Sequence, residues 1–354
     1  MDSNRQSSAL ANIIADEIAR AGVISFARFM ELALYHSEHG YYRKCLIGKA
    51  GDFFTSVSVG PLFGQLLGHY LSKLLAPMPG DLQIVEAGAN DGSLAFDTLD
   101  WLARNRPEFA RRVTYVIAEP LPQLQERQRT KLKDFNVRWV ADTEELAEIR
   151  GAILSNELLD AFPVHIFRWN TIRRRWREFG VDAAFQFAPM EQIPDWAGKA
   201  LEELKPLQPH LPDNFTVEFN PAAEAWWKKA AVRLVAGVIV AVDYGDEAFH
   251  MWSPSHAYGT VRAFKDHKLM SDPLVNPGEQ DITSSVNFTR IRLAGESVGL
   301  VSSPLQTQAQ FLNKIAVEFF SDPTANEVRQ FQTLTHPEHL GRAFKVLVQS
   351  RTNS

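Results

Sequence analysis

Two periods of hydrophobic and polar residues follow each other along the chain. Residues 8–35 carry apolar residues at helical spacing, which predicts two amphipathic helices that meet near Gly22. A glycine-containing loop follows, and residues 59–76 return to the helical period, with Pro61 near their start. We therefore expect an N-terminal helical segment over residues 1–80.

Short apolar runs then alternate with helical patterns. The strand-like runs occupy residues 82–88, 113–120, 136–142 and 151–163, the last continuing into a loop. Near-continuous apolar strands that alternate with helices imply a parallel sheet covered on both faces. We expect an α/β fold with a Rossmann-like, mostly parallel sheet, and we assign its first part, with a hairpin, to residues 81–183.

The alternation breaks after Pro163. Two strand-like runs flank a turn around Asn170 and predict a hairpin, and we interpret its basic run at 171–179 as a solvated face. Residues 184–236 are predicted to form a helical insertion. Residues 237–354 begin with a buried strand, cross a long polar stretch and end in helices and a strand, so we expect them to complete the core.

Composition narrows the function. The net charge is −5, which argues against a general polyanion-binding surface and hence against a nucleic-acid partner. Cys45 is the single cysteine, so no internal disulfide can form. The longest apolar run, residues 234–242, is far shorter than the about 20 residues that span a bilayer. Because the N-terminus also lacks a targeting pattern, we expect a cytoplasmic protein without membrane insertion.

The first chemical candidate is the turn after the first strand, which reads Glu86-Ala-Gly88-Ala-Asn90-Asp-Gly92. Backbone N–H groups of such a turn approach a ligand closely. The spacing differs from G-x-G-x-x-G and resembles the E/D-x-G-x-G-x-G loop of class I S-adenosylmethionine methyltransferases. Asn90 replaces a glycine, and asparagine tolerates the left-handed backbone best among the other residues. A strand–turn–helix unit without a ligand is the alternative.

Polar side chains also end the next strands. Glu119 follows the second strand and could accept hydrogen bonds from both ribose hydroxyls, or be an ordinary strand-end residue. Asp142 follows the third strand and could reach an adenine amino group or cap the next helix. The fourth strand leads to Asn156, Glu157 and Asp160. They form a candidate catalytic loop in which Glu157 holds a cationic substrate, the alternative being a capping and ion-pair set.

With these residues the chain resembles the MidA family of methyltransferases, which includes an arginine methyltransferase of mitochondrial complex I assembly. The matching stretches are LYHSEHGYY (34–42), GDFFTSVSVGPLFG (51–64), VEAGANDGSLAFD (85–97), SNELLDAFPV (155–164), VDYG (242–245), NPGEQDITSSVNFT (276–289) and GRAFKVLV (341–348). Together they span nearly the whole chain in order. The resemblance implies a class I methyltransferase fold and S-adenosylmethionine as the cofactor.

The resemblance also implies roles for individual residues. The cofactor set comprises Asp52, Phe53, Thr55, Ser56, Glu86, Gly88, Asn90, Gly92, Glu119 and Asp142, the first four in a segment expected to close over the cofactor. The catalytic set is Asn156, Glu157 and Asp160. The substrate side comprises Tyr42, Gln280, Asp281 and Thr283, for which the alternatives are ordinary packing of Tyr42 and fixing of their loop by the other three. The chain departs from the family at Asp91, whose negative charge should weaken cofactor binding unless the side chain points away or pairs with the cofactor's amino group.

Direct, in-line methyl transfer from S-adenosylmethionine to a protein arginine is therefore the main expectation. One alternative is a small-molecule N- or O-methyltransferase with an amine or hydroxyl acceptor. Another is a non-catalytic assembly factor that binds the cofactor and acts through protein contacts. No histidines and carboxylates show credible metal spacing, so we expect no metal.

Overall fold

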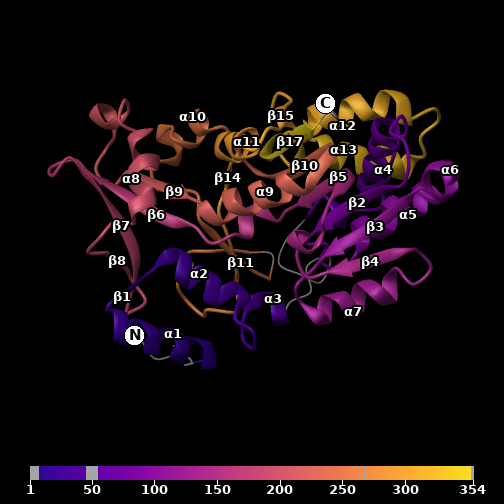
Figure 1. Ribbon diagram of the computed structural model, residues 1–354. Helices are drawn as coiled ribbons and strands as arrows, with labels where there is room; N and C mark the ends of the chain where they lie inside the picture. Colours follow the sequence, from indigo (N-terminus) through magenta and orange to yellow (C-terminus); the bar gives the residue numbers. More distant parts are fainter. Residues whose placement is uncertain (1–7, 45–54, 267, 352–354) are drawn as a thin grey trace. The chain divides into compact units, whose positions relative to one another are not determined.

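The computed structural model describes residues 8–44, 55–266 and 268–351. The chain divides into two compact units, each built from three segments (Figure 1). The sheet unit comprises Leu46–Asp160, Glu224–Asp246 and Phe288–Ser354. The hairpin unit comprises Met1–Cys45, Ala161–Ala223 and Glu247–Asn287.

A mostly parallel sheet organises the sheet unit. Its strands follow the order β15-β17-β10-β5-β2-β3-β4, and β17 pairs antiparallel with β10 while β10, β5, β2, β3 and β4 run parallel. The strands are β2 (Leu82–Ala87), β3 (Val113–Ala118), β4 (Val137–Val140), β5 (Ile149–Asn156), β10 (Leu234–Asp246), β15 (Val301–Ser302), β16 (Gln306–Thr307) and β17 (Phe344–Arg351). The predicted α/β fold with a largely parallel sheet is confirmed.

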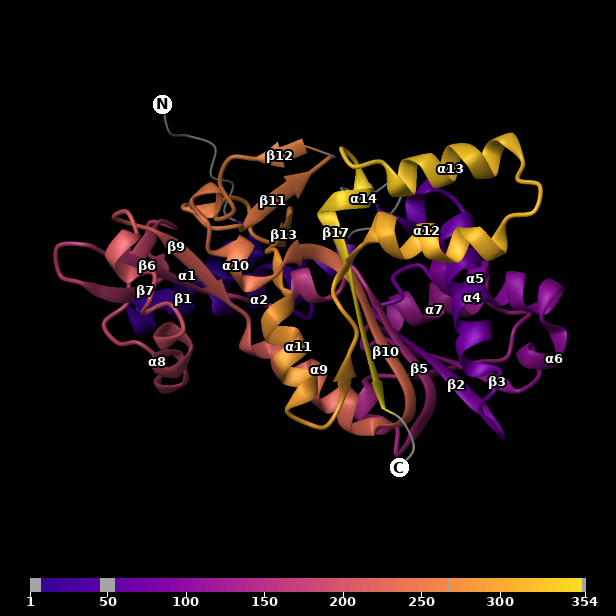
Figure 2. The ribbon, with the colours of Figure 1, turned by 90° about the horizontal axis from the view of Figure 1, so that it is seen from above.

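Helices cover both faces of this sheet (Figure 2). They are α4 (Leu62–Leu75), α5 (Ser93–Asn105), α6 (Pro107–Ala110), α7 (Pro122–Lys131), α9 (Pro221–Arg233), α11 (Phe288–Glu296), α12 (Gln308–Phe319), α13 (Ala325–Thr335) and α14 (Leu340–Ala343), with short 3-10 turns η1 (Val57–Val59), η2 (Thr143–Glu145) and η3 (Leu159–Ala161). Leu66 and Leu71 of α4 pack with Ile84 and Val346 in one core. Each fully buried leucine contributes about 1.5–3 kcal/mol. On the other face, Trp227 of α9 donates a 2.6 Å hydrogen bond to Gln349 of β17.

The hairpin unit has its own sheets and cores. One sheet follows the order β1-β7-β6-β9 with β8 on β7, and another follows β12-β11-β13. The elements are α1 (Ala9–Ala21), β1 (Val23–Ser25), α2 (Phe26–Tyr35), α3 (Tyr41–Lys44), β6 (His165–Asn170), β7 (Arg175–Asp182), β8 (Phe187–Pro189), α8 (Asp195–Glu202), η4 (Gln208–His210), β9 (Thr216–Phe219), α10 (Ala248–Met251), η5 (Pro254–His256), β11 (Arg262–Lys265), β12 (Lys268–Met270), β13 (Asp281–Thr283) and β14 (Val286–Asn287). Phe26 and Phe29 of α2 pack with Val181 of β7 in one of these cores.

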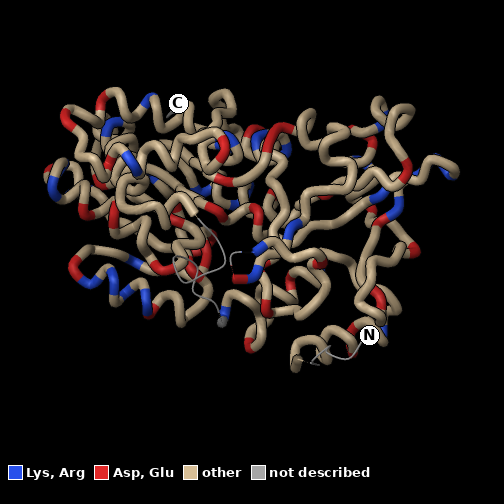
Figure 3. Tube along the Cα trace, turned by 180° about the vertical axis from the view of Figure 1, so that it is seen from behind, with Lys and Arg blue, Asp and Glu red and all other residues tan. Residues whose placement is uncertain are grey.

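Several local predictions agree with the structure. The two N-terminal helices are α1 and α2, and Ser25 caps α2 by accepting a 3.1 Å hydrogen bond from the Arg28 N–H. The predicted hairpin is β6–β7, and the basic residues at its turn, 173–175, are exposed. Figure 3 shows basic and acidic residues interspersed along the rest of the trace. No helix of the described residues is long and apolar enough to cross a membrane.

Other local predictions are wrong in detail. Residues 184–236 contain the strands β8 and β9 besides helices, and the polar stretch at 246–290 contains β11, β12 and β13. The helix predicted after the third strand is only the 3-10 turn η2. β9 is only four residues long, and although its sequence alternates polar Thr216 and Glu218 with apolar Val217 and Phe219, all four side chains are buried.

Candidate functional site

The turn between β2 and α5 adopts the backbone that a ligand-cradling loop requires. Gly88, Asn90 and Gly92 have φ values of 70°, 48° and 80°, so three alternate residues are left-handed. A Cβ atom at Gly88 would lie 2.8 Å from Leu158 Cδ1 and would force that side chain to shift, and the left-handed φ also favours glycine at this position. Asn90 therefore takes the left-handed conformation expected of it, and the loop keeps its shape without a glycine there.

Asp91 is engaged within the protein. Its Oδ1 accepts a 3.0 Å hydrogen bond from the Ser93 N–H and its Oδ2 accepts one of 3.0 Å from the Ser93 hydroxyl. The same carboxylate pairs with the Lys131 ammonium of α7. Asp91 thus satisfies the start of α5 while Lys131 balances its charge. The negative charge that was expected to weaken cofactor binding is therefore paired inside the chain, and its effect on that binding stays a prediction.

Glu119 is a buried carboxylate just beyond the end of β3, with an exposed fraction of 3%. Its Oε1 accepts a 3.0 Å hydrogen bond from the Leu121 N–H, and its Oε2 lies 3.4 Å from Gln128 Nε2. Burial raises the pKa of Glu119 to about 6, although both hydrogen bonds act in the opposite direction. A second acceptor position on each oxygen remains available to a ligand that donates hydrogen bonds.

Gln128 of α7 connects loop 88–92, Glu119 and strand β4 by hydrogen bonds, and the sequence analysis did not predict this role. Its Nε2 donates a 2.8 Å hydrogen bond to the Asn90 carbonyl and faces Glu119, while its Oε1 accepts a 2.9 Å bond from Trp139 Nε1 of β4. The side chain is fully buried although α7 is otherwise polar. Nothing in the pattern of α7 distinguishes Gln128 from the neighbouring glutamines.

Glu86 and Asp142 differ in their surroundings. Glu86 is buried at the end of β2 and accepts a 2.6 Å hydrogen bond from the Tyr115 hydroxyl. Burial raises the pKa of Glu86 to about 7, and the charge of Asp91 adds to this rise. Asp142 is exposed and caps η2 by accepting a 2.9 Å hydrogen bond from the Glu144 N–H. Capping, one of the two interpretations of Asp142, is therefore present.

The candidate catalytic loop starts where β5 ends. Glu157 has a left-handed φ of 51°, and its N–H donates a 2.9 Å hydrogen bond to the Val242 carbonyl. Its Oε1 accepts hydrogen bonds from Asn156 Nδ2 at 3.2 Å and from the Ser56 N–H at 3.3 Å. Asn156 Oδ1 is buried without a hydrogen-bond partner among the described residues. An unsatisfied buried acceptor is costly, so this atom is suited to a ligand donor.

Asp243 of β10 lies beneath this loop. Its Oδ2 accepts hydrogen bonds from three successive N–H groups, those of Leu158 at 3.1 Å, Leu159 at 2.8 Å and Asp160 at 3.4 Å. Its Oδ1 accepts a 2.8 Å bond from the Tyr244 N–H. Burial, together with the charge of Glu157, raises the pKa of Asp243 well above its usual range. Sequence analysis matched VDYG to the family but assigned Asp243 no role.

The segment expected to close over the cofactor is only partly described. Asp52 and Phe53 lie outside the described residues. Thr55 exchanges hydrogen bonds with Ser58, since each backbone N–H donates to the other's hydroxyl. Ser56 is fully buried, and its hydroxyl lies 3.0 Å from Gln308 Oε1 of α12. Of these residues, Ser56 contacts the catalytic loop through Glu157.

Two of the predicted substrate-side residues meet within the hairpin unit. The Tyr42 hydroxyl donates a 3.0 Å hydrogen bond to Asp281 Oδ1, and the Tyr42 ring lies 5.4 Å from that of Tyr35. Gln280 is almost fully buried and donates hydrogen bonds to the carbonyls of residues 272 and 273, so it fixes its loop. Thr283 pairs with Arg262 in the β11–β13 ladder.

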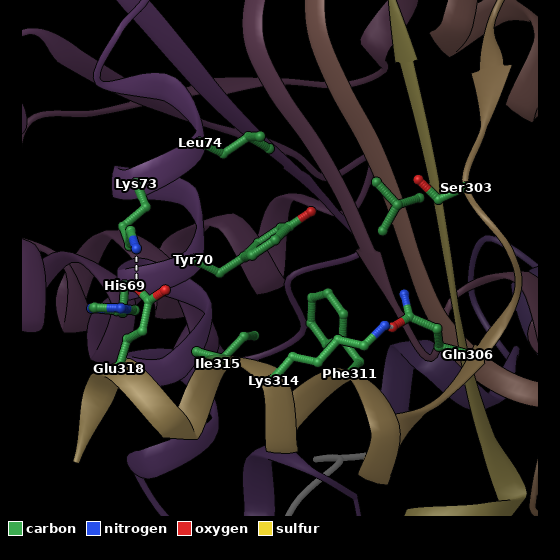
Figure 4. A pocket seen from close by; sticks show the side chains of 11 residues that line it. His69, Tyr70, Lys73, Leu74, Ser303, Gln306, Phe311, Lys314, Ile315 and Glu318 are labelled. Carbon is green, nitrogen blue, oxygen red and sulfur yellow. Dashed lines mark hydrogen bonds and ion pairs between the residues drawn. The ribbon is translucent and has the colours of Figure 1, made fainter.

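A separate cavity of about 370 Å³ lies between α4 and α12 (Figure 4). Tyr70, Lys73, Phe311 and Lys314 are among its lining residues, and Lys73 pairs with Glu318. Val348 at its floor pairs with Val240, which precedes Asp243 along β10. None of the described residues that line this cavity belongs to the candidate site. Among the described residues, no group of histidines, cysteines and carboxylates could hold a metal ion.

A family model described as "Putative S-adenosyl-L-methionine-dependent methyltransferase" matches residues 66–305. The chain belongs to this family. The resemblance to the MidA methyltransferases is confirmed, and the protein is an S-adenosylmethionine-dependent methyltransferase. The residues present fit this cofactor, because loop 88–92 forms a left-handed turn after β2 and Glu119 is a buried carboxylate just beyond the end of the neighbouring strand β3.

Relatives of this methyltransferase cover most of its length. The "Protein arginine methyltransferase NDUFAF7 homolog, mitochondrial" of Drosophila melanogaster is 27% identical, over 96% of this chain and 84% of the relative. The human "Protein arginine methyltransferase NDUFAF7, mitochondrial" is 24% identical, over 93% and 81%. A Burkholderia thailandensis protein, crystallised with S-adenosyl-homocysteine, superposes with a TM-score of 0.84 at 29% identity, over 98% of this chain and 92% of its own.

These relatives also correct one expectation. The lack of a targeting pattern led us to expect a cytoplasmic protein, whereas the curated relatives are named as mitochondrial. The prediction of a cytoplasmic location is therefore wrong on this comparison. The prediction rested on the lack of a membrane-spanning run and of a targeting pattern, and neither observation specifies a compartment.

Proposed function

We propose that this methyltransferase modifies the guanidinium group of an arginine in a protein substrate, held by Glu157 and Asn156. The supporting observation is the pair of acceptors where β5 ends: the Glu157 carboxylate and Asn156 Oδ1, which has no hydrogen-bond partner in the described part of the chain. A guanidinium carries five N–H donors and no acceptor, so it complements such a pair. A hydroxyl acceptor would carry a single donor and could therefore bind only one of these two groups.

The proposed chemistry is a direct displacement. S-adenosylmethionine, when bound, supplies an electrophilic methyl group. Glu157 binds the guanidinium and orients one nitrogen, and a new N–C bond forms as the S–C bond breaks. The attacking nitrogen loses one proton, which we assign to the Glu157 carboxylate before release to solvent, and the products are a methylated arginine and S-adenosyl-homocysteine. Orientation of this kind lowers a barrier by on the order of 7–11 kcal/mol in favourable cases.

The proposal extends to the other predicted residues. On the cofactor side we assign loop 88–92 to the cofactor's charged end, Glu119 to its ribose hydroxyls, and supporting roles to Thr55, Ser56, Glu86 and Asp142. On the substrate side, Tyr42 and Asp281 present an aromatic ring and a carboxylate in contact, a combination that suits a guanidinium. The arginine methyltransferase names of the Drosophila and human relatives support the same substrate class.

The test uses cofactor labelled in its methyl group. The protein is incubated with this cofactor and a cell lysate, and the protein and small-molecule fractions are analysed separately by mass spectrometry. We expect label in methylated arginine residues of proteins. Label confined to small molecules would replace the protein substrate with a small amine or hydroxyl acceptor, and no transfer to either fraction would contradict the proposal.

Variants then test the role of Glu157. Glu157→Gln removes the charge and keeps the shape, so it should abolish transfer while the affinity for S-adenosyl-homocysteine stays within about twofold, because the lost interaction is with the acceptor. Glu108→Gln, on the exposed surface of α6, is the matched control and should behave as wild type. Undiminished turnover in Glu157→Gln would remove this residue from the mechanism.

A further inference from the structure

We infer that Asp243 is the positioning residue of the catalytic loop, holding Glu157 where it can orient the methyl acceptor. Asp243 stands on β10 and the loop follows β5, so residues remote in sequence meet where these neighbouring strands end. Its role rests on the proposed function of Glu157. No other residue assignment made above includes Asp243.

The contacts of Asp243 define the path of the loop. A single oxygen, Oδ2, receives the N–H groups of residues 158, 159 and 160, which immediately follow Glu157. Three successive N–H groups that converge on one point require the chain to turn tightly after Glu157. The second oxygen is held by the Tyr244 N–H, which fixes the plane of the carboxylate. The loop is thus tied to a strand of the central sheet.

The backbone of Glu157 explains why such an anchor is needed. Its φ of 51° is left-handed, which residues with a Cβ atom seldom adopt without support from their surroundings. The hydrogen bond from the Glu157 N–H to the Val242 carbonyl holds the near side of this residue. Asp243 holds the far side through residues 158–160. Between these two anchors, the direction of the Glu157 side chain is determined by the backbone.

The position of Asp243 favours a positioning role over direct contact with a substrate. Its side chain is completely buried, and four backbone N–H groups already occupy its two oxygens. A substrate would have to displace these bonds to reach it. Asp243 therefore acts on the substrate indirectly, by positioning Glu157, which is only partly buried.

The test compares Asp243→Asn with wild type in three measurements. Asparagine has a single acceptor oxygen and brings N–H donors toward the N–H groups of the loop, so the loop should lose its anchor. In the variant, we expect faster hydrogen exchange in a peptide covering residues 157–162. The rate of methyl transfer at saturating cofactor should fall by roughly a hundredfold, which is the effect of a small misplacement of a reacting group. Affinity for S-adenosyl-homocysteine should stay within about threefold, because loop 88–92 and Glu119 are untouched.

Asp182→Asn is the matched control. Asp182 Oδ1 accepts hydrogen bonds from the N–H groups of Ala184 and Gln186, so this carboxylate also organises a turn, but it stands at the end of β7 in the hairpin unit. The control should leave transfer unchanged. If Asp243→Asn exchanges faster at 157–162 yet transfers methyl groups normally, the loop does not need its anchor and the inference is overturned.

Two further outcomes keep the test decisive. If Asp243→Asn does not fold, hydrogen exchange of the wild-type protein provides the test. The amides of residues 158–160 should then exchange as slowly as those of β5, and fast exchange would show that Asp243 does not hold the loop. Failure of the proposed function is distinguishable, because it appears as unchanged turnover in Glu157→Gln. Loss of transfer in Glu157→Gln with normal transfer in Asp243→Asn would overturn this inference alone.

Discussion

The pH dependence of cofactor binding gives a quantitative test of the role assigned to Glu119. Burial raises the pKa of this carboxyl to about 6. Only the ionised form can accept hydrogen bonds on both oxygens, so protonation should weaken binding of a ribose diol. At pH 5, one unit below that pKa, only roughly one chain in eleven is ionised, whereas at pH 8 almost all are. Affinity should therefore be about tenfold weaker at pH 5 than at pH 8 from this group alone.

The assay is a calorimetric titration with S-adenosyl-homocysteine at pH 5, 6, 7 and 8. The pKa of Glu86 is raised to about 7, so Glu86 adds its own pH dependence to cofactor binding. The informative quantity is therefore the difference in binding free energy between the wild type and Glu119→Gln at each pH. At pH 8 the variant should bind more weakly by about 1.5–3 kcal/mol, the value of a hydrogen bond to a charged group. Toward pH 5 the difference between the two proteins should shrink by about 1.4 kcal/mol, which is the tenfold factor.

Wild-type affinity of Glu119→Gln for S-adenosyl-homocysteine, with an unchanged pH profile, would contradict the role assigned to Glu119. Glu108→Gln serves again as the control, because Glu108 is exposed on α6 and pairs only with Arg111 among its described neighbours. A uniform loss in Glu119→Gln at every pH would show that the carboxylate supports the loop without titrating in this range.

Three other changes test the remaining parts of the cofactor edge. Gln128→Leu leaves the Asn90 carbonyl and Trp139 Nε1 without their hydrogen-bond partner, so the unfolding free energy measured with denaturant should fall by about 1–3 kcal/mol. A calorimetric titration should also show weaker cofactor binding, and unchanged values in both measurements would contradict the connecting role of Gln128. Asp91→Ala removes contacts to Ser93 and should cost about 1 kcal/mol of stability, with cofactor affinity within about twofold; a tighter-binding variant would show that Asp91 opposes the cofactor. The folded-state pKa of Glu86 is raised to about 7, so the stability that its protonated carboxyl contributes is present below the pKa of the unfolded state and is lost as the pH rises through about 7. Without cofactor, the unfolding free energy should therefore fall over this range by at most about 3 kcal/mol relative to that of Glu86→Gln. A difference between the two proteins that does not change with pH would contradict the burial of Glu86 as a protonated carboxyl.

The parts of the fold that the sequence predicted are those with a strong local signal. The strands β2, β3, β5 and β10 are apolar runs bounded by turn residues, and each is present. The left-handed Asn90 was expected from the backbone preference of asparagine alone. The polar loop that follows β5 was identified from its position at the carboxyl end of an apolar strand, and the resemblance to a family supported that interpretation.

The parts that escaped prediction depend on contacts between remote residues. Asp243 meets residues 158–160 only after β10 has paired with β5, and VDYG gives no local sign of the partner. Lys131 balances Asp91 from another helix, so the sequence around Asp91 shows an uncompensated charge. Sequence patterns indicate where a strand ends, whereas the residues that meet at that end are decided by strand order.

The placement of β17 has a consequence for how the protein is made. This last strand pairs antiparallel with β10 along eight residues, from Tyr244 with Phe344 to Gly237 with Arg351. Until it has been synthesised, β10 presents a long, apolar edge with unpaired backbone groups, which is a template for aggregation. A chain cut short before β17 would keep the loop 88–92 and the catalytic loop and still be expected to precipitate. Chaperone dependence during synthesis should therefore fall sharply once residues 344–351 are free to pair.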